Sequence, residues 1–175
     1  AERPDDIEGH RLLVRNEVAL GNFSAAREAQ EQVLAILGDA ATATDFADYA
    51  DVLVMAAGGY VSPEAEAALT QALRRDPANM AARYYSGLLM IQTGRPDIGF
   101  RLWRALLEQS APTDPWVAPI RAQLPELAQI AGVRNFQMPA MPTGPAVPGR
   151  GPSAEQMDAA AEMTAEERAG MIRGV

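Results

Sequence analysis

Two stretches of this 175-residue chain match each other at a constant spacing. Residues 12–34, LLVRNEVALGNFSAAREAQEQVL, align without a gap with residues 85–107, YSGLLMIQTGRPDIGFRLWRALL, at an offset of 73. Residues 64–73, EAEAALTQAL, repeat the second half of this pattern 34 positions before the third copy. Such a chain is predicted to stack copies of one unit, because a single unit cannot cover its own apolar face.

The repeated unit is about 34 residues long and is predicted to hold two helices, a length typical of tetratricopeptide repeats. Small residues such as Gly87 and Gly99 stand where the two helices cross, and Trp103 is expected to fill the space beside them. Asp76 ends the second copy, because a residue that precedes proline avoids helical angles. We therefore predict an all-α solenoid of three tetratricopeptide-repeat hairpins, with an ordinary helical bundle as the alternative.

The repeats and the segments after them divide the chain into three parts. Residues 1–132 are predicted to form the repeat domain and an end helix from about Val117, which Pro125 would kink or interrupt. Residues 133–152 are rich in Pro and Gly and are predicted to form an extended strap. Residues 153–175 regain helical character, so we expect short helices or a disordered tail.

Charge and composition narrow the class of protein. The net charge of −8 argues against nucleic acid or an anionic membrane surface as the main partner. No stretch approaches the roughly 20 apolar residues of a membrane span. The chain begins with Ala1 and not with Met, so we expect a processed product or a fragment, with any membrane anchor in a segment absent from this chain.

The sequence offers few groups for catalysis or metal binding. It contains no Cys, and His10 is its only His, which excludes thiolate and His-rich metal sites. No nucleophile stands with a recognisable base. We therefore expect a binding protein and no enzyme, metal or cofactor.

The candidate site follows from helical phase, because the first helices of the repeats line the concave side of such a stack. The predicted peptide-binding residues are Arg11, Arg15 and Val18 in the first copy, Asp51, Val54 and Met55 in the second, and Tyr84, Leu88 and Ile91 in the third. Glu8, Ala47 and Ala81 share this phase. The arginines are expected to meet a carboxylate, and the apolar side chains to meet an amphipathic helix. A solvated face for the arginines, and a core position for Leu88 and Ile91, are the alternatives.

Two longer stretches resemble a known family. Residues 46–79, FADYADVLVMAAGGYVSPEAEAALTQALRRDPAN, and 86–116, SGLLMIQTGRPDIGFRLWRALLEQSAPTDPW, are similar to the periplasmic repeat domain of the c-type cytochrome biogenesis family CcmI, also called CycH. The shared marks are DYAD with its Gly58-Gly59 turn, ALRRDPAN, the helix of Trp103, and the SAPTDP exit. Gly99, where that helix often has Ala, and Pro96, where an aromatic residue is usual, depart from the pattern.

The resemblance implies a function. Members of this family hold apocytochrome c in the bacterial periplasm, grip its C-terminal helix, and present its Cys-x-x-Cys-His segment for thiol reduction and haem ligation. We therefore expect an apocytochrome c chaperone that contacts the other maturation components and is tethered to the inner membrane by a part that precedes this chain. A general scaffold that joins two folded proteins is the alternative.

Overall fold

The computed structural model describes residues 6–140, and all regular structure in that range is helical. The helices are α1 (Ile7–Leu20), α2 (Phe23–Leu37), the short 3-10 helix η1 (Gly38–Ala40), α3 (Ala43–Ala56), α4 (Pro63–Arg75), α5 (Met80–Gln92), α6 (Pro96–Leu107) and α7 (Val117–Ile130). None of them is both long and apolar enough to span a membrane. The predicted all-α fold is confirmed, whereas the predicted tail, residues 153–175, lies outside the described range.

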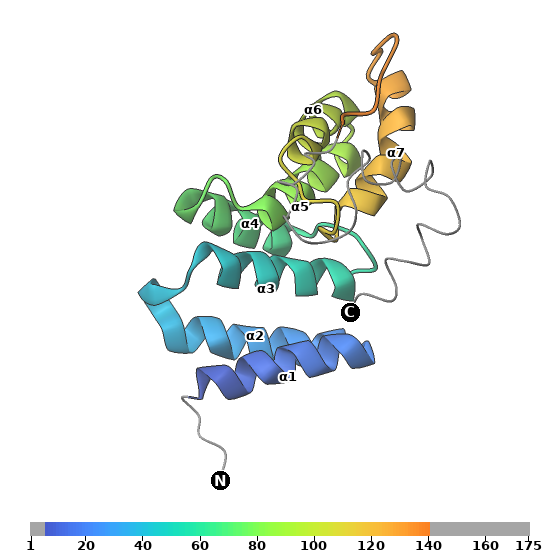
Figure 1. Ribbon diagram of the computed structural model, residues 1–175. Coiled ribbons are helices and arrows are strands. Elements are labelled where there is room, and N and C mark those ends of the chain that lie inside the picture. Colours follow the sequence, from blue (N-terminus) through green and yellow to red (C-terminus); the bar gives the residue numbers. More distant parts are fainter. Residues whose placement is uncertain (1–5, 141–175) are drawn as a thin grey trace, which may run out of the picture. The chain divides into compact units, whose positions relative to one another are not determined.

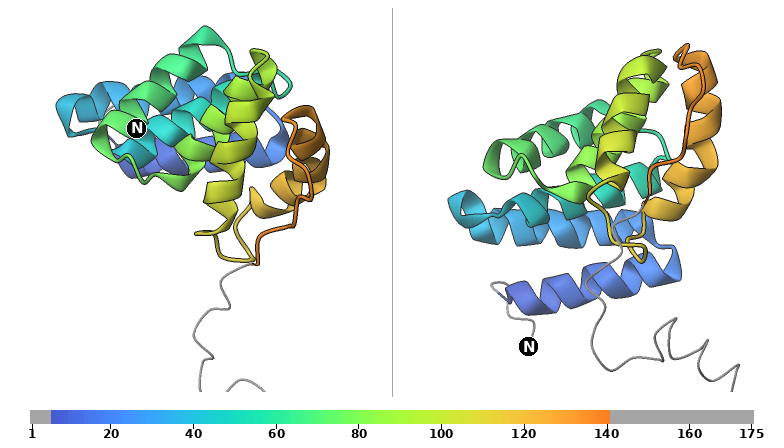
Figure 2. Two further views of the ribbon diagram at one scale, coloured as in Figure 1. Left: turned by 90° about the horizontal axis from the view of Figure 1, so that it is seen from above. Right: turned by 45° about the horizontal axis from the view of Figure 1, so that its top comes forward.

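The helices pack as consecutive hairpins, as the repeats predicted (Figure 1). The partners within the hairpins are α1 with α2, α3 with α4, and α5 with α6. Successive hairpins join through α2 on α3 and α4 on α5, and α7 packs on α6 at the end of the stack. The two further views show that successive hairpins are rotated with respect to each other (Figure 2). This order places the first helices α1, α3 and α5 along one side, where α3 also contacts α5.

The turns inside the first and third hairpins are built alike. Gly21 and Gly94, which the repeat alignment superimposes, have φ angles of 76° and 78°. Side chains disfavour this left-handed conformation, so glycine is the natural residue at both positions. Elsewhere the helix starts carry side-chain caps: the oxygens of Thr42, Ser62 and Asn79 accept backbone N–H groups in the first turns of α3, α4 and α5.

Small residues allow α5 and α6 to cross closely, as the sequence predicted. A Cβ atom on Gly87 would lie 2.4 Å from Cδ1 of the Trp103 indole, and one on Gly99 would lie 2.4 Å from Cγ1 of Ile91. Trp103 is fully buried at this crossing. Glycine at both positions is therefore required by the close approach of two helices and not by the flexibility of the backbone.

The end helix α7 covers α6 with a row of buried apolar residues, among them Ile120, Leu124 and Leu127. The helix continues through Pro125 to Ile130, so the expected interruption does not occur. Because proline has no backbone N–H, one helical hydrogen bond is missing at this point. Pro125 is exposed, so the carbonyl left without that bond lies near solvent. After α7 the chain turns back, and Phe136 packs edge-to-face on Phe100 with ring centroids 5.5 Å apart.

Candidate peptide-binding groove

Two adjoining hollows form one groove along the first helices of the hairpins. The larger, of about 470 Å³, lies between α3, α5 and the loop before α7, and is lined by Ala47, Asp48, Asp51, Met55, Ala81, Tyr84, Tyr85, Pro115 and Trp116. The smaller, of about 260 Å³, is lined by Arg11, Val14, Arg15, Val18, Gln30, Asp48, Asp51 and Val52. Asp48 and Asp51 belong to both hollows. We call the combined surface the groove.

Another hollow lies at the α1–α2 turn, where Gly21, Asn22 and Ser24 are among its lining residues. It shares no residue with the groove. Phe23, Arg27 and Ala56 complete its lining, so it includes none of the aromatic side chains of α5.

Aromatic side chains build one end of the groove. Tyr84 and Tyr85 meet edge-to-face with ring centroids 4.9 Å apart, and Tyr84 stacks on the buried Trp103. The Tyr85 hydroxyl donates a hydrogen bond to the Asp51 carboxylate. Trp116 donates its indole N–H to the hydroxyl of the buried Ser110 at 2.8 Å. These contacts hold the rings in place before any ligand arrives.

Burial at this end of the groove affects both tyrosines. It raises the pKa of Tyr85, and the hydrogen bond to the negative Asp51 raises it further. Burial raises the pKa of Tyr84 as well, again with a contribution from the charge of Asp51. Both phenols are therefore neutral at physiological pH, and Tyr85 acts as a hydrogen-bond donor to Asp51.

Two carboxylates occupy the middle of the groove. Burial, followed by the negative charges of Asp51 and Asp45, raises the pKa of Asp48 to about 6. Asp48 as a whole residue is nevertheless exposed to solvent, so water screens this effect and limits its size. Burial also raises the pKa of Asp51, although the Tyr85 hydroxyl opposes the change. Within residues 6–140 no ion pair involves Asp48 or Asp51.

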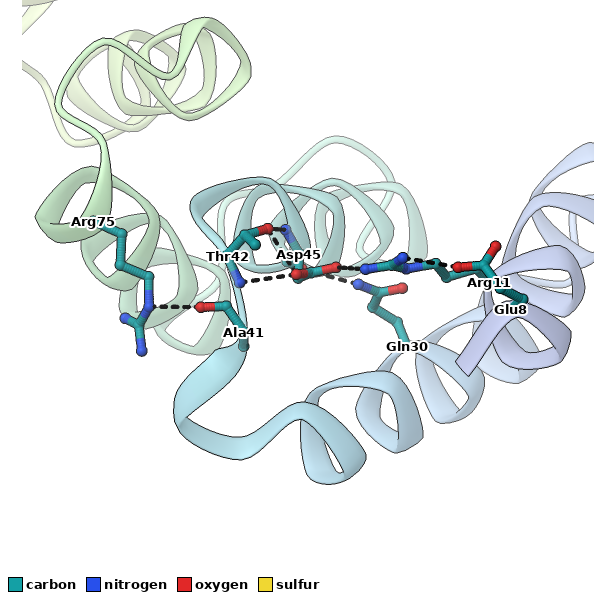
Figure 3. A network of polar contacts seen from close by, with 7 residues as sticks. All are labelled: Glu8, Arg11, Gln30, Ala41, Thr42, Asp45 and Arg75. Carbon is teal, nitrogen blue, oxygen red and sulfur yellow. Dashed lines mark hydrogen bonds and ion pairs between the residues drawn. The ribbon is translucent and has the colours of Figure 1, made fainter. Parts of the chain in front are cut away.

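Arg11, at the α1 end of the groove, is held by a polar network (Figure 3). Its Nη2 donates to Asp45 Oδ1 at 2.7 Å, and its Nη1 donates to Glu8 Oε1 at 3.0 Å. The hydroxyl and backbone N–H of Thr42 both donate to the other oxygen of Asp45. Gln30 donates to the Asp45 carbonyl oxygen at 2.9 Å, so the network joins α1, α2 and α3.

The network sets the charge state of Asp45. Burial opposes ionisation, but the bonds from Thr42 and then from Arg11 outweigh it, so the pKa of Asp45 is lowered. The same bond to Asp45 raises the pKa of Arg11. Arg15, one turn later in α1, is exposed and takes part in no ion pair among the residues described. Of the two arginines predicted to meet a ligand, only Arg15 has an uncommitted charge.

The structure distributes the predicted site residues between the groove and the core. Those that line the groove are Arg11, Arg15, Val18, Asp51, Met55 and Tyr84. Val54 is only 4 % exposed and belongs to the core, so it is left out of the surface that we propose below. Leu88 and Ile91 are half-buried and pack against the core clusters. Ala47 and Ala81 also line the groove, whereas Glu8 pairs with Arg11 beside it.

Seven further residues line the groove without having been predicted, and three of them, Asp48, Tyr85 and Trp116, carry the argument below. Asp48 lies one turn before Asp51 on the same face of α3, so the i, i+3 spacing was a usable signal. Tyr85 lines the groove together with its neighbour Tyr84, although helical phase alone favoured only Tyr84. Trp116 precedes α7 in an irregular segment, where helical phase gives no information.

Comparisons with known proteins identify relatives of the chain. No family model matches it. It is 34% identical over 176 residues to the cytochrome c-type biogenesis protein CycH of Rhizobium meliloti. This alignment covers 100% of this chain and 43% of that protein. It is 27% identical to the protein of the same name from Bradyrhizobium diazoefficiens, over 99% of this chain and 42% of that protein. Along its whole length, therefore, the chain is a homologue of these two cytochrome c-type biogenesis proteins named CycH, and it spans less than half of their length.

Proposed function

We propose that this chain acts in c-type cytochrome biogenesis as the module that binds apocytochrome c. In this proposal the groove holds the C-terminal helix of the unfolded client, while the rest of the client stays accessible for haem ligation. The observation that carries the proposal is the groove itself, an open surface across α1, α3 and α5 with apolar and aromatic side chains at one end. The names of the two relatives support the biological process.

The lining of the groove suits an amphipathic helix. Met55, Tyr84 and Trp116 provide apolar surface that the apolar face of a guest helix can cover. Aromatic residues commonly dominate the binding energy of such interfaces. Met55 is an exposed methionine, whose flexible thioether adapts to guests of different shape. The groove is therefore suited to several related clients and not to one rigid surface.

The proposal includes a location and partners. An apocytochrome c chaperone of this kind works in the periplasm, tethered to the inner membrane by a part that precedes this chain, and passes its client to the haem-ligation and thiol-reduction components. A binding module without catalytic activity is sufficient for this role. A scaffold that joins two folded proteins is the alternative, and the choice of client form in a binding experiment separates the two.

Calorimetric titration with a synthetic peptide of an apocytochrome c C-terminal helix tests the proposal. We expect the peptide to bind and folded holocytochrome c to bind much more weakly, because folding of the cytochrome buries the apolar face of that helix. Equal affinity for the two forms would favour the scaffold, and no binding of the peptide would overturn the proposal.

One variant inside the groove and one control variant outside it together locate the surface that binds the peptide. Met55→Glu places a charge in the apolar end of the groove and should weaken peptide binding by about thirtyfold, because the loss of an anchor commonly costs about 2 kcal/mol or more. Ala67→Glu adds the same charge on the exposed face of α4, outside the groove, and should leave the affinity unchanged. Equal losses in both variants would place the binding surface elsewhere.

A further inference from the structure

We propose that Asp48 and Asp51 make the groove selective for a guest helix that carries a lysine or arginine side chain beside its apolar face. The inference rests on the proposed function in one respect, that the groove holds a helical peptide. It adds the chemistry by which guests are chosen, which a merely apolar groove would not provide.

The position of the two carboxylates is the first argument. Asp48 and Asp51 lie one turn apart on α3, the middle of the three helices that form the groove, and both line its two hollows. A guest that spans from the arginine end to the aromatic end must therefore pass over both carboxylates.

The second argument is that neither carboxylate has an internal cation paired with it among the residues described. Arg15 lines the smaller hollow with both carboxylates but forms no ion pair with either, and the guanidinium of Arg11 is already bound to Asp45 and Glu8. The Tyr85 hydroxyl gives Asp51 a neutral donor and no positive charge. Burial raises the pKa of both carboxylates, and for Asp48 the positive charge of Arg11 only partly opposes this change. A cation supplied by the guest would complete the electrostatics of the groove.

The third argument is what a guest without a cation would cost. A purely apolar helix placed over the groove would take two carboxylates out of water without pairing them, which is unfavourable. An acidic residue at that position would add repulsion between like charges. A basic residue avoids both penalties, so the carboxylates discriminate against the wrong guests as well as attracting the right ones.

The surroundings of the carboxylates suit a long basic side chain. Tyr84 and Trp116 lie in the same hollow, where the methylene stem of lysine or arginine can pack against the rings while the charged group reaches Asp48. At the opposite end Arg15 is exposed and available for a carboxylate of the guest. The groove thus presents a positive, a negative and an aromatic zone in that order, and this order favours one direction of the guest helix.

Designed peptides test the inference without a cytochrome. Two amphipathic helical peptides share one apolar face and differ at a single flanking position, which is lysine in one and glutamate in the other. We expect the lysine peptide to bind at least about tenfold more tightly, a difference typical of one favourable charge contact. The double substitution Asp48→Asn with Asp51→Asn should remove most of this preference while keeping side-chain size.

A matched control has the same change of net charge. Glu28→Gln with Glu66→Gln neutralises two exposed carboxylates on α2 and α4, outside the groove, and should preserve the preference for lysine. The inference is overturned if the unsubstituted protein binds the two peptides equally, if it binds neither, or if the preference survives in the Asp48, Asp51 variant. Failure of the apocytochrome peptide alone would instead overturn the proposed function, so the two outcomes are distinct.

A chemical crosslink provides a second readout. The chain contains no lysine, so a carbodiimide, which couples carboxylates to amines, can link its side chains to a lysine peptide without competition from lysines of its own. We expect mass spectrometry to find the peptide lysine joined to Asp48 or Asp51, and the crosslink to disappear in the double asparagine variant. Crosslinks that fall only on acidic residues outside the groove would contradict the inference.

Discussion

The indole Nε1 of Trp103 donates a hydrogen bond to the carbonyl oxygen of Tyr84 at 2.9 Å, and the two rings stack with centroids 5.5 Å apart. Trp103 is fully buried in α6, whereas Tyr84 is half-buried in α5 and lines the groove. The packing of the third hairpin therefore sets the position of one wall of the groove. A change at this helix crossing should alter both stability and binding.

Gly87→Ala tests the helix crossing. The new Cβ atom would lie 2.4 Å from two atoms of the rigid Trp103 indole. We expect the free energy of unfolding to fall by about 1–3 kcal/mol, as is usual for overpacked cores, although alanine favours a helix by about 1 kcal/mol over glycine. Urea denaturation measures the change. In a Trp103→Leu background the same substitution should cost much less, and equal costs in the two backgrounds would contradict this explanation.

The sequence predicted this crossing because the repeats carry their geometry with them. The gapless alignment superimposes Gly21 on Gly94, and both adopt the same left-handed turn. The same alignment placed Gly87, Gly99 and Trp103 at one crossing, where the structure finds them in contact. A pattern that recurs at a fixed offset constrains the backbone of every copy, so turns and helix contacts were predictable.

The side chains of the groove were harder to predict, because phase along a helix is set by packing against its neighbours. Val54 and Met55 are adjacent in sequence and were both assigned to the groove, yet the structure buries Val54 and exposes Met55. Successive residues point about 100° apart on a helix, so one helix face rarely holds both. Trp116 lies outside any helix, and the bond from Arg11 to Asp45 spans 34 residues, so local spacing revealed neither.

Asp45→Asn tests the polar network that joins α1 to α3. Asparagine keeps the size of the side chain but loses the charge that Arg11 and the two donors of Thr42 share. We expect a loss of about 1.5–3 kcal/mol in the free energy of unfolding, the range for hydrogen bonds to charged groups. Glu8→Gln is the control, because Glu8 is largely exposed and should contribute less than about 1 kcal/mol.

Acid should remove the effect of Asp45→Asn. The pKa of Asp45 in the folded protein is lowered from its ordinary value of 3.8, so its stabilising effect is present above pH 3.8 and is lost as the pH falls through the folded value. The difference in stability between the original protein and the variant should therefore shrink as the pH falls below 3.8. A difference that stays constant would assign the effect to shape and not to charge.

Asp48→Asn should show the opposite pH dependence. Folding raises the pKa of Asp48 from 3.8 to about 6, so the folded state binds the proton more tightly. The contribution of Asp48 to stability is then fully present below pH 3.8 and is lost as the pH rises through about 6. The variant should therefore gain stability relative to the original protein between these pH values and keep that gain at pH 7.5.

Thermal melts across pH 4–8 measure this difference for Asp48. The charged and titratable groups that line the groove with it, or that act on its charge, are Arg11 and Arg15 of α1, Asp45 and Asp51 of α3, and Tyr84 and Tyr85 of α5. Glu28→Gln, outside the groove, is the control for a general effect of net charge. A flat difference between Asp48→Asn and the original protein over this range would mean that water screens Asp48 almost fully.

The last prediction separates two arginines that lie one turn apart. Arg11→Gln should lower the melting temperature, because it leaves the buried Asp45 without its cation. Arg15→Gln should leave the melting temperature unchanged, because Arg15 is exposed and takes part in no ion pair within residues 6–140. If Arg15 meets a carboxylate of the guest, its replacement should weaken peptide binding, and the loss should shrink at high salt, where the Debye length falls to about 3 Å at 1 M. Calorimetric titration at low and high salt measures the binding. A stable Arg11 variant that loses binding, beside an Arg15 variant that binds normally, would reverse these two roles.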